Sequence, residues 1–302
     1  MMSSNDSQRW RTLTACLAAL TLAACGGSED PFAAADGGNN NGGADSAPAS
    51  NADARVTDAG TVSCAPTPSR LIVLGDSVAA CSTVSGGVGS ANCSATMVYE
   101  HLKATVNPQL TYENVAVPGA VTEDIPNDQI GDVSPAPGHA LVLIFVGGND
   151  LQPYIFISDS AATSRYATDE PRLKLEWDRI YAWLENPSNF PDGVTLMMST
   201  QYNPFDDCTS SPYNLSQYKT GLLSDFNQTL TEQANAREYA IITNQHTSFL
   251  GHGHHYQVQE CPHFQASSEG WMQDLIHPNN AGHANLAKNW NTTADAIYGS
   301  CD

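Results

Sequence analysis

ALVLIFV at residues 140–146, followed directly by GGND at residues 147–150, is the strongest secondary-structure signal in the chain. A wholly apolar run of this length that stops at two glycines is typical of a strand buried on both faces of a parallel sheet. Four further short runs rich in apolar residues predict strands, at residues 70–74, 111–117, 194–199 and 239–243. The sequence therefore predicts a five-stranded sheet.

Helical spacing of apolar residues separates these strands. It predicts helices at residues 94–106, 171–185, 215–238 and 279–297, with Pro171 in the first turn of the second one. Strands that alternate with helices indicate an α/β domain built on one doubly wound parallel sheet. In such sheets ligands bind beyond the carboxyl ends of the strands, so we look there for the functional residues.

The composition excludes several functional classes. The chain has 302 residues, is 41% hydrophobic, and carries 32 acidic against 12 basic residues, for a formal net charge of −20. This balance argues against binding to nucleic acid, which requires clustered Lys and Arg, and against electrostatic docking on anionic lipid. No apolar run reaches the roughly 18 residues that a membrane-spanning helix needs.

The first residues are typical of an export signal. Arg9 and Arg11 precede a short apolar stretch that ends in Leu-Ala-Ala-Cys25, and this ending resembles the bacterial lipobox. We expect residues 1–24 to be a lipoprotein signal peptide and Cys25 to carry the lipid, with an ordinary secretory peptide as the alternative. Gly26 after the cysteine favours, by the same resemblance, the outer membrane of a Gram-negative bacterium.

Residues 25–62 are rich in Gly, Ala and Asn, which predicts a disordered tether, and residues 63–302 form the globular domain. Six cysteines follow the tether, and an even number in an oxidising compartment predicts three disulfides. The pairing that we favour is Cys81–Cys93, Cys208–Cys261 and Cys64–Cys301. Free buried thiols are the alternative.

Polar residues with catalytic potential follow the predicted strands. Ser77, in Gly-Asp-Ser after the first strand, can project its hydroxyl at the sheet edge, although such a serine also serves as a helix cap. Asp274 and His277 lie three residues apart, so the carboxylate can hold the imidazole Nδ1–H and leave Nε2 free as a base. A surface aspartate with a capping histidine is the other interpretation of that pair.

Two further segments supply candidate hydrogen-bond donors. Asn149 follows the strongest predicted strand, where its amide can face a developing oxyanion, or where it simply occupies a Gly-Asn turn. Gly119 ends the segment NVAVPG after the second strand, and a glycine there lets backbone N–H groups approach a ligand closely.

Taken together and in this order, LGDS at 74–77, NVAVPG at 114–119, VGGND at 146–150 and DLIHP at 274–278 resemble the four blocks of the SGNH, or GDSL-like, hydrolase family. The resemblance covers residues 71–297 and departs from the family pattern where Val78 stands in place of leucine. It implies a single three-layer, flavodoxin-like domain. It also implies Ser77 as nucleophile, His277 as general base, Asp274 as its orienting acid, and an oxyanion hole from the N–H groups of Ser77 and Gly119 and the side chain of Asn149.

The function that this resemblance implies is hydrolysis of a carboxylic ester through an acyl-enzyme, by a monomer that needs no metal and no cofactor. The ester would belong to a small molecule or be linked to a polymer. A carbohydrate O-acetyl esterase or acyltransferase is one alternative, and a non-catalytic cell-surface binding module on the same fold is another. Leu151, Tyr154 and Phe156 are candidates for the wall of an acyl pocket or for ordinary core.

Histidines are concentrated in one region of the chain, at His246, His252, His254, His255 and His263. A zinc site needs three or four such side chains at ligand spacing. The Gly-His-Gly-His-His pattern is typical of a loop and offers no free thiolate if Cys261 is oxidised. We therefore expect a structural role for these histidines, with a zinc site as the alternative.

Overall fold

The computed structural model describes residues 64–299 except 212 and 214. The predicted signal peptide, lipidated Cys25, tether and Cys301 lie outside the described residues.

Five parallel strands form one sheet in the order β2-β1-β3-β4-β5. Their bounds are β1 Arg70–Gly75, β2 Thr111–Asn114, β3 Ala140–Phe145, β4 Val194–Ser199 and β5 Ala240–Thr243. This is the flavodoxin-like strand order, and the central position of β3 follows from its wholly apolar sequence. The predicted α/β domain with a five-stranded parallel sheet is confirmed.

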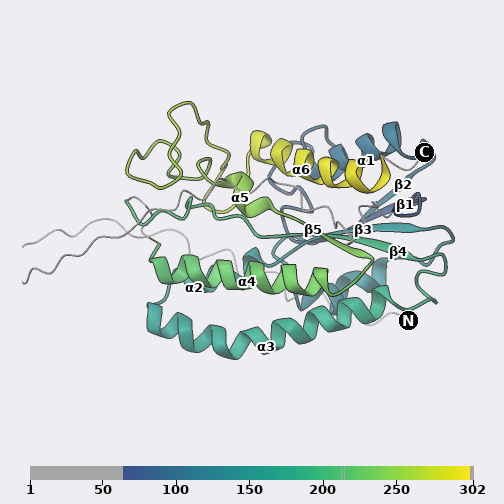
Figure 1. The fold of residues 1–302 in the computed structure, drawn as a ribbon, viewed down its shortest axis with the longest axis horizontal. Helices are drawn as coiled ribbons and strands as arrows, with labels where there is room; N and C mark the ends of the chain where they lie inside the picture. The colour runs from purple at the N-terminus through teal and green to yellow at the C-terminus, as the bar shows by residue number, and fades with distance from the viewer. Residues whose placement is uncertain (1–63, 212, 214, 300–302) are drawn as a thin grey trace, which may run out of the picture. The chain divides into compact units, whose positions relative to one another are not determined.

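Helices cover both faces of the sheet (Figure 1). Helices α1 (Ser94–Thr105) and α6 (Asn280–Tyr298) lie on one face, and α3 (Asp159–Leu184) and α4 (Gln217–Asn235) lie on the other. Shorter helices follow two strands: α2 (Gly148–Ile155) comes after β3, and α5 (Gln245–Phe249) comes after β5. A π-helical turn, η1 (Ile125–Gln129), continues into the 3₁₀ turn η2 (Ile130–Asp132).

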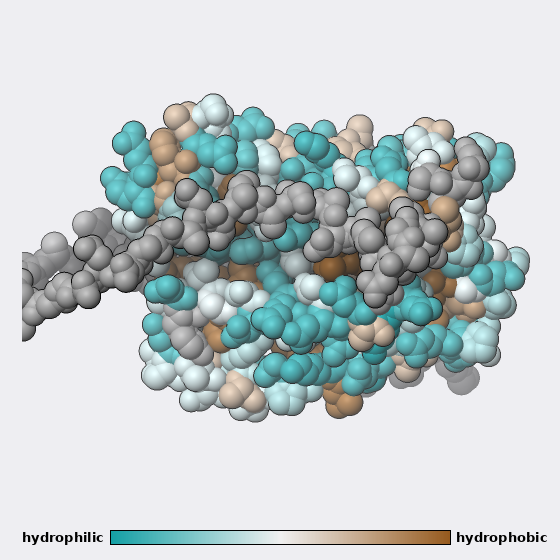
Figure 2. Space-filling model, viewed as in Figure 1, coloured by the Kyte–Doolittle hydropathy of each residue, from teal (hydrophilic) through white to brown (hydrophobic). Residues whose placement is uncertain are grey.

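The alternation of side chains along β1 divides the core in two. Leu71 and Val73 pack with residues of α1 and α6, whereas Ile72 and Leu74 pack with residues of α3 and α4. All four side chains are fully buried, because successive residues of a strand point to opposite faces and both faces are covered. Polar residues cover most of the described surface on the face seen in Figure 2.

Helix α3 differs from its prediction. It begins at Asp159, and Pro171 lies in its interior, so the assignment of Pro171 to a first turn was wrong. The helix begins earlier because the Ser158 side chain accepts a hydrogen bond from the Ala161 N–H, at 3.3 Å, and caps it. Helix α2, which contains Asn149, was not predicted.

Strand β2 is shorter than predicted and ends at Asn114. The Asn114 side chain accepts from the N–H of Ala116 at 3.0 Å, which turns the chain locally away from regular strand geometry. Hydrogen bonds to β1 continue beyond this turn, because the N–H of Val117 donates to the carbonyl of Gly75 at 3.0 Å.

Two of the predicted disulfides are present, Cys81–Cys93 and Cys208–Cys261. Cys64 is also disulfide-bonded, while the partner predicted for it, Cys301, lies outside the described residues. The N–H of Ala65 donates to the carbonyl of Ile297 at 3.2 Å, so the two ends of the domain lie side by side. Within the described part of the chain, no helix has the length and apolar character needed to cross a membrane.

Candidate active site

The candidate site lies where the strand order reverses. Strand β1 has β2 on one side and β3 on the other, so the chain leaves the carboxyl ends of β1 and β3 in opposite directions. Ser77 follows β1, and Asn149 follows β3 in the first turn of α2. Open α/β sheets bind their ligands in the crevice that forms at such a point.

Ser77, His277 and Asp274 form one hydrogen-bonded chain, although Ser77 and His277 are 200 residues apart in sequence. The Ser77 Oγ lies 2.9 Å from the His277 Nε2. The His277 Nδ1 lies 2.9 Å from Oδ1 and 2.8 Å from Oδ2 of Asp274. With Nδ1 protonated and donating to the carboxylate, Nε2 is free to accept the serine proton.

Asp274 is held by the backbone of its own turn. Its Oδ1 accepts from the N–H of Ile276 at 3.0 Å and from the N–H of His277 at 2.9 Å. Partial burial raises the pKa of Asp274, but these two N–H groups and the His277 side chain outweigh it and bring the pKa below its ordinary value. The carboxylate is therefore ionised at neutral pH and orients the imidazole.

The turn that carries Ser77 depends on close packing of β1 against β3. Gly75 has φ +143°, and a Cβ at this position would lie 2.0 Å from the carbonyl oxygen of Phe145. The buried side chain of Gln129 accepts from the Gly75 N–H at 2.9 Å and donates to the Gly75 carbonyl at 2.8 Å. Gln129 was not predicted, because a single glutamine distant in sequence from the turn belongs to no motif.

Asp76 stabilises the same turn from inside. Its Oδ1 accepts from the Val78 N–H at 2.9 Å, and the side chain is buried. Burial raises the pKa of Asp76 to about 7, with the Val78 N–H opposing the shift and the nearby charge of Asp150 adding to it.

The predicted oxyanion donors come from two segments that are hydrogen-bonded to each other. The Asn149 Nδ2 donates to the carbonyl of Ala120 at 2.9 Å. The Asp150 Oδ2 accepts from both the N–H and the hydroxyl of Thr122, at 2.9 and 3.0 Å. Burial raises the pKa of Asp150 to about 6, and these two donors from Thr122 oppose the shift. Gly119 directly precedes Ala120, the first of the residues bonded to Asn149 and Asp150. It is exposed and has φ +86°.

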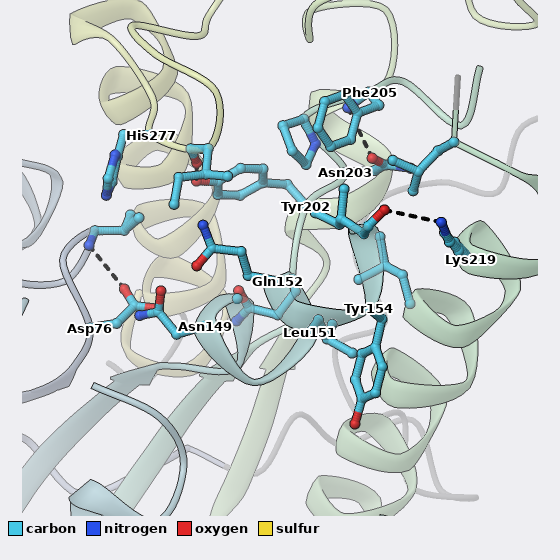
Figure 3. A pocket seen from close by; sticks show the side chains of 18 of the residues that line it. Asp76, Asn149, Leu151, Gln152, Tyr154, Tyr202, Asn203, Phe205, Lys219 and His277 are labelled. Carbon is cyan, nitrogen blue, oxygen red and sulfur yellow. Dashed lines mark hydrogen bonds between the residues drawn. The ribbon is translucent and has the colours of Figure 1, made fainter. Parts of the chain in front are cut away.

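An apolar pocket opens beside these residues (Figure 3). It encloses about 780 Å³ with its open mouth included, and Ser77, Asn149 and His277 line it. Asp274 lies behind His277, and Gly119 is not part of the lining. Two of the three residues proposed for the pocket wall, Leu151 and Tyr154, do line it. The third, Phe156, lies outside it and is 68% exposed.

A second loop system supports the histidine side of the site. The buried carboxylate of Asp206 accepts from the backbone N–H groups of Gly251, Gly253 and His255, at 3.0, 2.6 and 2.8 Å. The hydroxyl of Tyr202 donates to the carbonyl of Ile276, next to His277, at 2.5 Å. Neither residue carries a sequence signal, because each contact joins loops that are distant in the chain.

The histidine-rich segment has structural partners. His255 is buried, and both of its ring nitrogens face backbone carbonyl oxygens. The other contacts are His254 with the Leu275 carbonyl, His252 stacked on Trp271, and His246 with Asp207. Among the residues that the structure describes, no three histidine, cysteine or acidic side chains are grouped as metal ligands.

The family model of the GDSL-like lipases and acylhydrolases matches residues 71–290. The chain belongs to this family. It is therefore a carboxylic ester hydrolase with the SGNH-type α/β fold, and the four sequence blocks that resemble the family lie within the matched region, between residues 74 and 278.

Solved structures share the fold at low sequence identity. Phospholipase A1 from Streptomyces albidoflavus is 18% identical, with a TM-score of 0.54 over 76% of this chain and 99% of that one. An extracellular lipase from Streptomyces rimosus is 20% identical, with a TM-score of 0.52 over the same shares of the two chains. No curated protein sequence matches the chain.

Proposed function

We propose that this hydrolase cleaves carboxylic esters by a serine mechanism, with Ser77 as nucleophile, His277 as general base and Asp274 as the orienting acid. One observation carries the proposal: the continuous hydrogen-bonded chain from the Ser77 hydroxyl through His277 to Asp274, at the edge of an apolar pocket. A serine activated in this way is the usual nucleophile of acyl transfer.

The reaction proceeds in two halves. The Ser77 Oγ attacks the ester carbonyl while its proton passes to the His277 Nε2. The tetrahedral intermediate collapses, the alcohol leaves with the proton returned by His277, and the acyl group stays on Ser77. Water then attacks the acyl-enzyme while its proton passes to the His277 Nε2. The bond from the acyl carbon to the Ser77 Oγ breaks, His277 returns the proton to that oxygen, and the carboxylic acid is released.

The negative charge on the tetrahedral oxygen needs donors that are already in place. We assign this role to the N–H of Ser77, the N–H of Gly119 and the side chain of Asn149. The Asn149 amide has two N–H donors, and its bond to the Ala120 carbonyl occupies one of them. The other is available to the substrate, and losing such a donor typically costs about 3 kcal/mol of transition-state stabilisation.

A fluorophosphonate probe tests the assignment, because it labels only an activated hydroxyl. The wild-type protein should be labelled and should hydrolyse p-nitrophenyl esters. Ser77→Ala should lose the label and lower kcat by roughly 10⁴-fold or more, since the change removes only the nucleophilic oxygen. Substantial hydrolysis by Ser77→Ala would reject the serine mechanism.

Ser94→Ala is the matched control. Ser94 is a second serine that contacts a histidine, with its Oγ 3.0 Å from the Nδ1 of His283, but it is buried and lies away from the pocket. This variant should keep both the label and the turnover. If the probe instead labels Ser94, a Ser–His contact alone explains the reactivity and the assignment of Ser77 is wrong.

We also propose that the enzyme is anchored in the cell envelope through a lipid on Cys25, at the end of the lipobox-like Leu-Ala-Ala-Cys segment. Expression of the full chain in a Gram-negative host, followed by membrane fractionation, tests this. Cys25→Ser should move the protein from the membrane to the soluble fraction, whereas Cys16→Ser, in the apolar stretch, should not. A Cys25→Ser variant that stays with the membrane would reject the anchor.

A further inference from the structure

The pocket beside Ser77 extends away from the catalytic residues between α2 and α4 (Figure 3). Its walls include Leu151 and Tyr154 from α2 and Leu222 and Leu223 from α4. The Tyr154 hydroxyl donates to Asp169 at 2.7 Å, so its polar end is bonded to α3, while its ring packs against Tyr166 and also lines the pocket. The lining is thus suited to a hydrocarbon chain.

The direction of the pocket indicates which half of the ester enters it. His277 must return a proton to the departing alcohol oxygen, so the alcohol group has to lie on the histidine side. In Figure 3, His277 and Lys219 lie at opposite sides of the view, with Leu151 and Tyr154 on the side of Lys219. The acyl group, which remains on Ser77 after the alcohol leaves, is therefore the half that fits between α2 and α4.

The far end of this pocket is polar. Lys219, in the first turn of α4, lines the pocket with a side chain that is only 14% exposed. Its ammonium group donates to the carbonyl of Ile155, the last residue of α2, at 3.0 Å. The carboxylate of Asp159 lies 3.9 Å from it and accepts from the Ser216 hydroxyl at 2.8 Å. The ammonium is thus already supplied with an acceptor and a counter-ion.

The Lys219 ammonium limits how deep a hydrocarbon tail can enter. A tail that reached it would displace water from the ammonium without offering a hydrogen-bond acceptor in return, which is unfavourable. Up to that point each methylene gains from burial, by about 0.8 kcal/mol or roughly fourfold in kcat/KM. The value of kcat/KM should therefore rise with the length of the acyl chain and stop rising at the length that reaches Lys219. We call this length the break in the profile.

We propose that the pocket takes the straight apolar acyl chain of the ester and that Lys219 sets its upper length. The inference rests on the proposed serine mechanism, since it takes Ser77 as the point at which the acyl chain begins. It makes Lys219 a specificity-determining residue that limits the length of the acyl chain.

The experiment measures kcat/KM for p-nitrophenyl esters from acetate to palmitate, below the concentrations at which they aggregate. Lys219→Met keeps the length of the side chain and removes its charge. Lys174→Met is the matched control, because Lys174 lies on α3 outside the pocket and pairs with Glu170 at 2.8 Å. The profile of the control should coincide with that of the wild type.

Lys219→Met should move the break to longer acyl chains. For each methylene that is newly buried, kcat/KM should gain roughly fourfold relative to its value for the short esters. Leu223→Trp should move it to shorter chains, because Leu223 is a half-buried wall residue and a larger ring fills part of the pocket. Shifts in opposite directions from two residues of α4 would support the proposal, since general damage to the fold does not lengthen the preference.

Two results would overturn it. Profiles of Lys219→Met and Leu223→Trp that match the wild type would mean that the acyl chain lies elsewhere. A wild-type preference for esters of dicarboxylic acids, lost in Lys219→Met, would mean that Lys219 binds an anionic end group and does not exclude tails. Failure of the serine mechanism is separate, because it appears as turnover that survives Ser77→Ala, whatever the chain-length profile.

Discussion

The two halves of the candidate site are built in different ways. The half that carries the proposed nucleophile Ser77, here called the nucleophile half, comprises residues 75–79 and the Gln129 side chain. It is attached directly to the sheet, because Gly75 is the last residue of β1 and packs against the Phe145 carbonyl of β3. The histidine half, residues 201–208 and 249–277, contains little regular structure. Its loops are joined by the Cys208–Cys261 disulfide and by the hydrogen bonds that Asp206 accepts from three backbone N–H groups.

Because of this difference, we expect substitutions in the two halves to have different effects on stability and on activity. A change in the nucleophile half has to disturb the pairing of β1 with β3, so it should lower the free energy of unfolding of the whole domain. A change in the histidine half can open the cross-linked loops while the sheet stays folded, so it should act first on His277 and on kcat. Stability and activity measured on the same variants therefore separate the two halves.

Gly75→Ala should have the largest effect on stability. The new Cβ would meet the Phe145 carbonyl oxygen at 2.0 Å, and φ of +143° is strained for any L side chain, so the ends of β1 and β3 must separate. We expect the free energy of unfolding, measured by urea denaturation, to fall by about 4 kcal/mol.

Gly87→Ala is the control for this variant. Gly87 also has a positive φ, +58°, but nothing lies within 4 Å of its would-be Cβ. Gly87→Ala should lower the free energy of unfolding by only about 1–2 kcal/mol, because only the backbone conformation is unfavourable for alanine there. Equal losses for the two variants would show that contact with β3 does not determine the need for glycine at position 75.

Asp206→Asn should have a smaller and more local effect. The Asp206 Oδ1 accepts from two N–H groups and Oδ2 from a third, so replacing either oxygen with NH₂ sets a donor against a donor. We expect a local cost of about 3 kcal/mol, which is a rise of roughly 10²-fold in the amide hydrogen exchange of residues 251–255. The value of kcat should fall with it, because His254 in that loop contacts the Leu275 carbonyl near His277.

Asp207→Asn provides the comparison for Asp206→Asn. Asp207 is the next residue and also has a positive φ, +52°, but it is bonded to the side chains of Asn203 and His246. Exchange at residues 251–255 should change less in this variant. Global unfolding of Asp206→Asn, at the same cost as Gly75→Ala, would mean that the histidine half is not an independent unit.

The sequence alone predicted the sheet, because buried parallel strands are apolar throughout. The pair Asp274 and His277 was predictable because three residues fit one turn. The approach of Ser77 to His277 was implied only by the resemblance of the four sequence blocks to the hydrolase family, since His277 lies in a loop and directly follows no strand.

The contacts that could not be predicted join segments that are distant from each other in the chain. Asp206 accepts from N–H groups 45 to 49 residues further along, and Gln129 contacts a glycine 54 residues away, so no periodicity or motif marks either residue. The early start of α3 was missed for another reason. Pro171 is a good first-turn residue, and the preceding helical segment is polar, with Ala162 and Tyr166 as its buried residues.

The smallest effect that we predict concerns a buried histidine outside both halves. His283, on α6, is fully buried, and its Nδ1 lies 3.0 Å from the hydroxyl of Ser94, next to the Cys81–Cys93 disulfide. Burial, and secondarily the electrostatic effect of the nearby His277 imidazole, lowers the pKa of His283 to about 4. The folded protein therefore keeps this imidazole neutral well below the pH at which it is protonated in the unfolded chain.

The sign of the pH dependence follows from this difference. Between the unfolded pKa of about 6.5 and the folded pKa of about 4, the unfolded chain binds a proton that the folded protein does not, so stability falls as the pH falls. From pH 7 to pH 5 this amounts to about 2 kcal/mol. Asp76 and Asp150, whose raised pKa values act in the opposite direction, contribute equally to wild type and variant and cancel in their difference.

His283→Gln isolates the contribution, because glutamine is polar but does not titrate. We expect wild type to be more stable than His283→Gln at pH 7 by some margin, and that margin to shrink by about 2 kcal/mol at pH 5, as measured by urea denaturation at both pH values. A margin that is the same at both pH values would mean that His283 takes up its proton in the folded state.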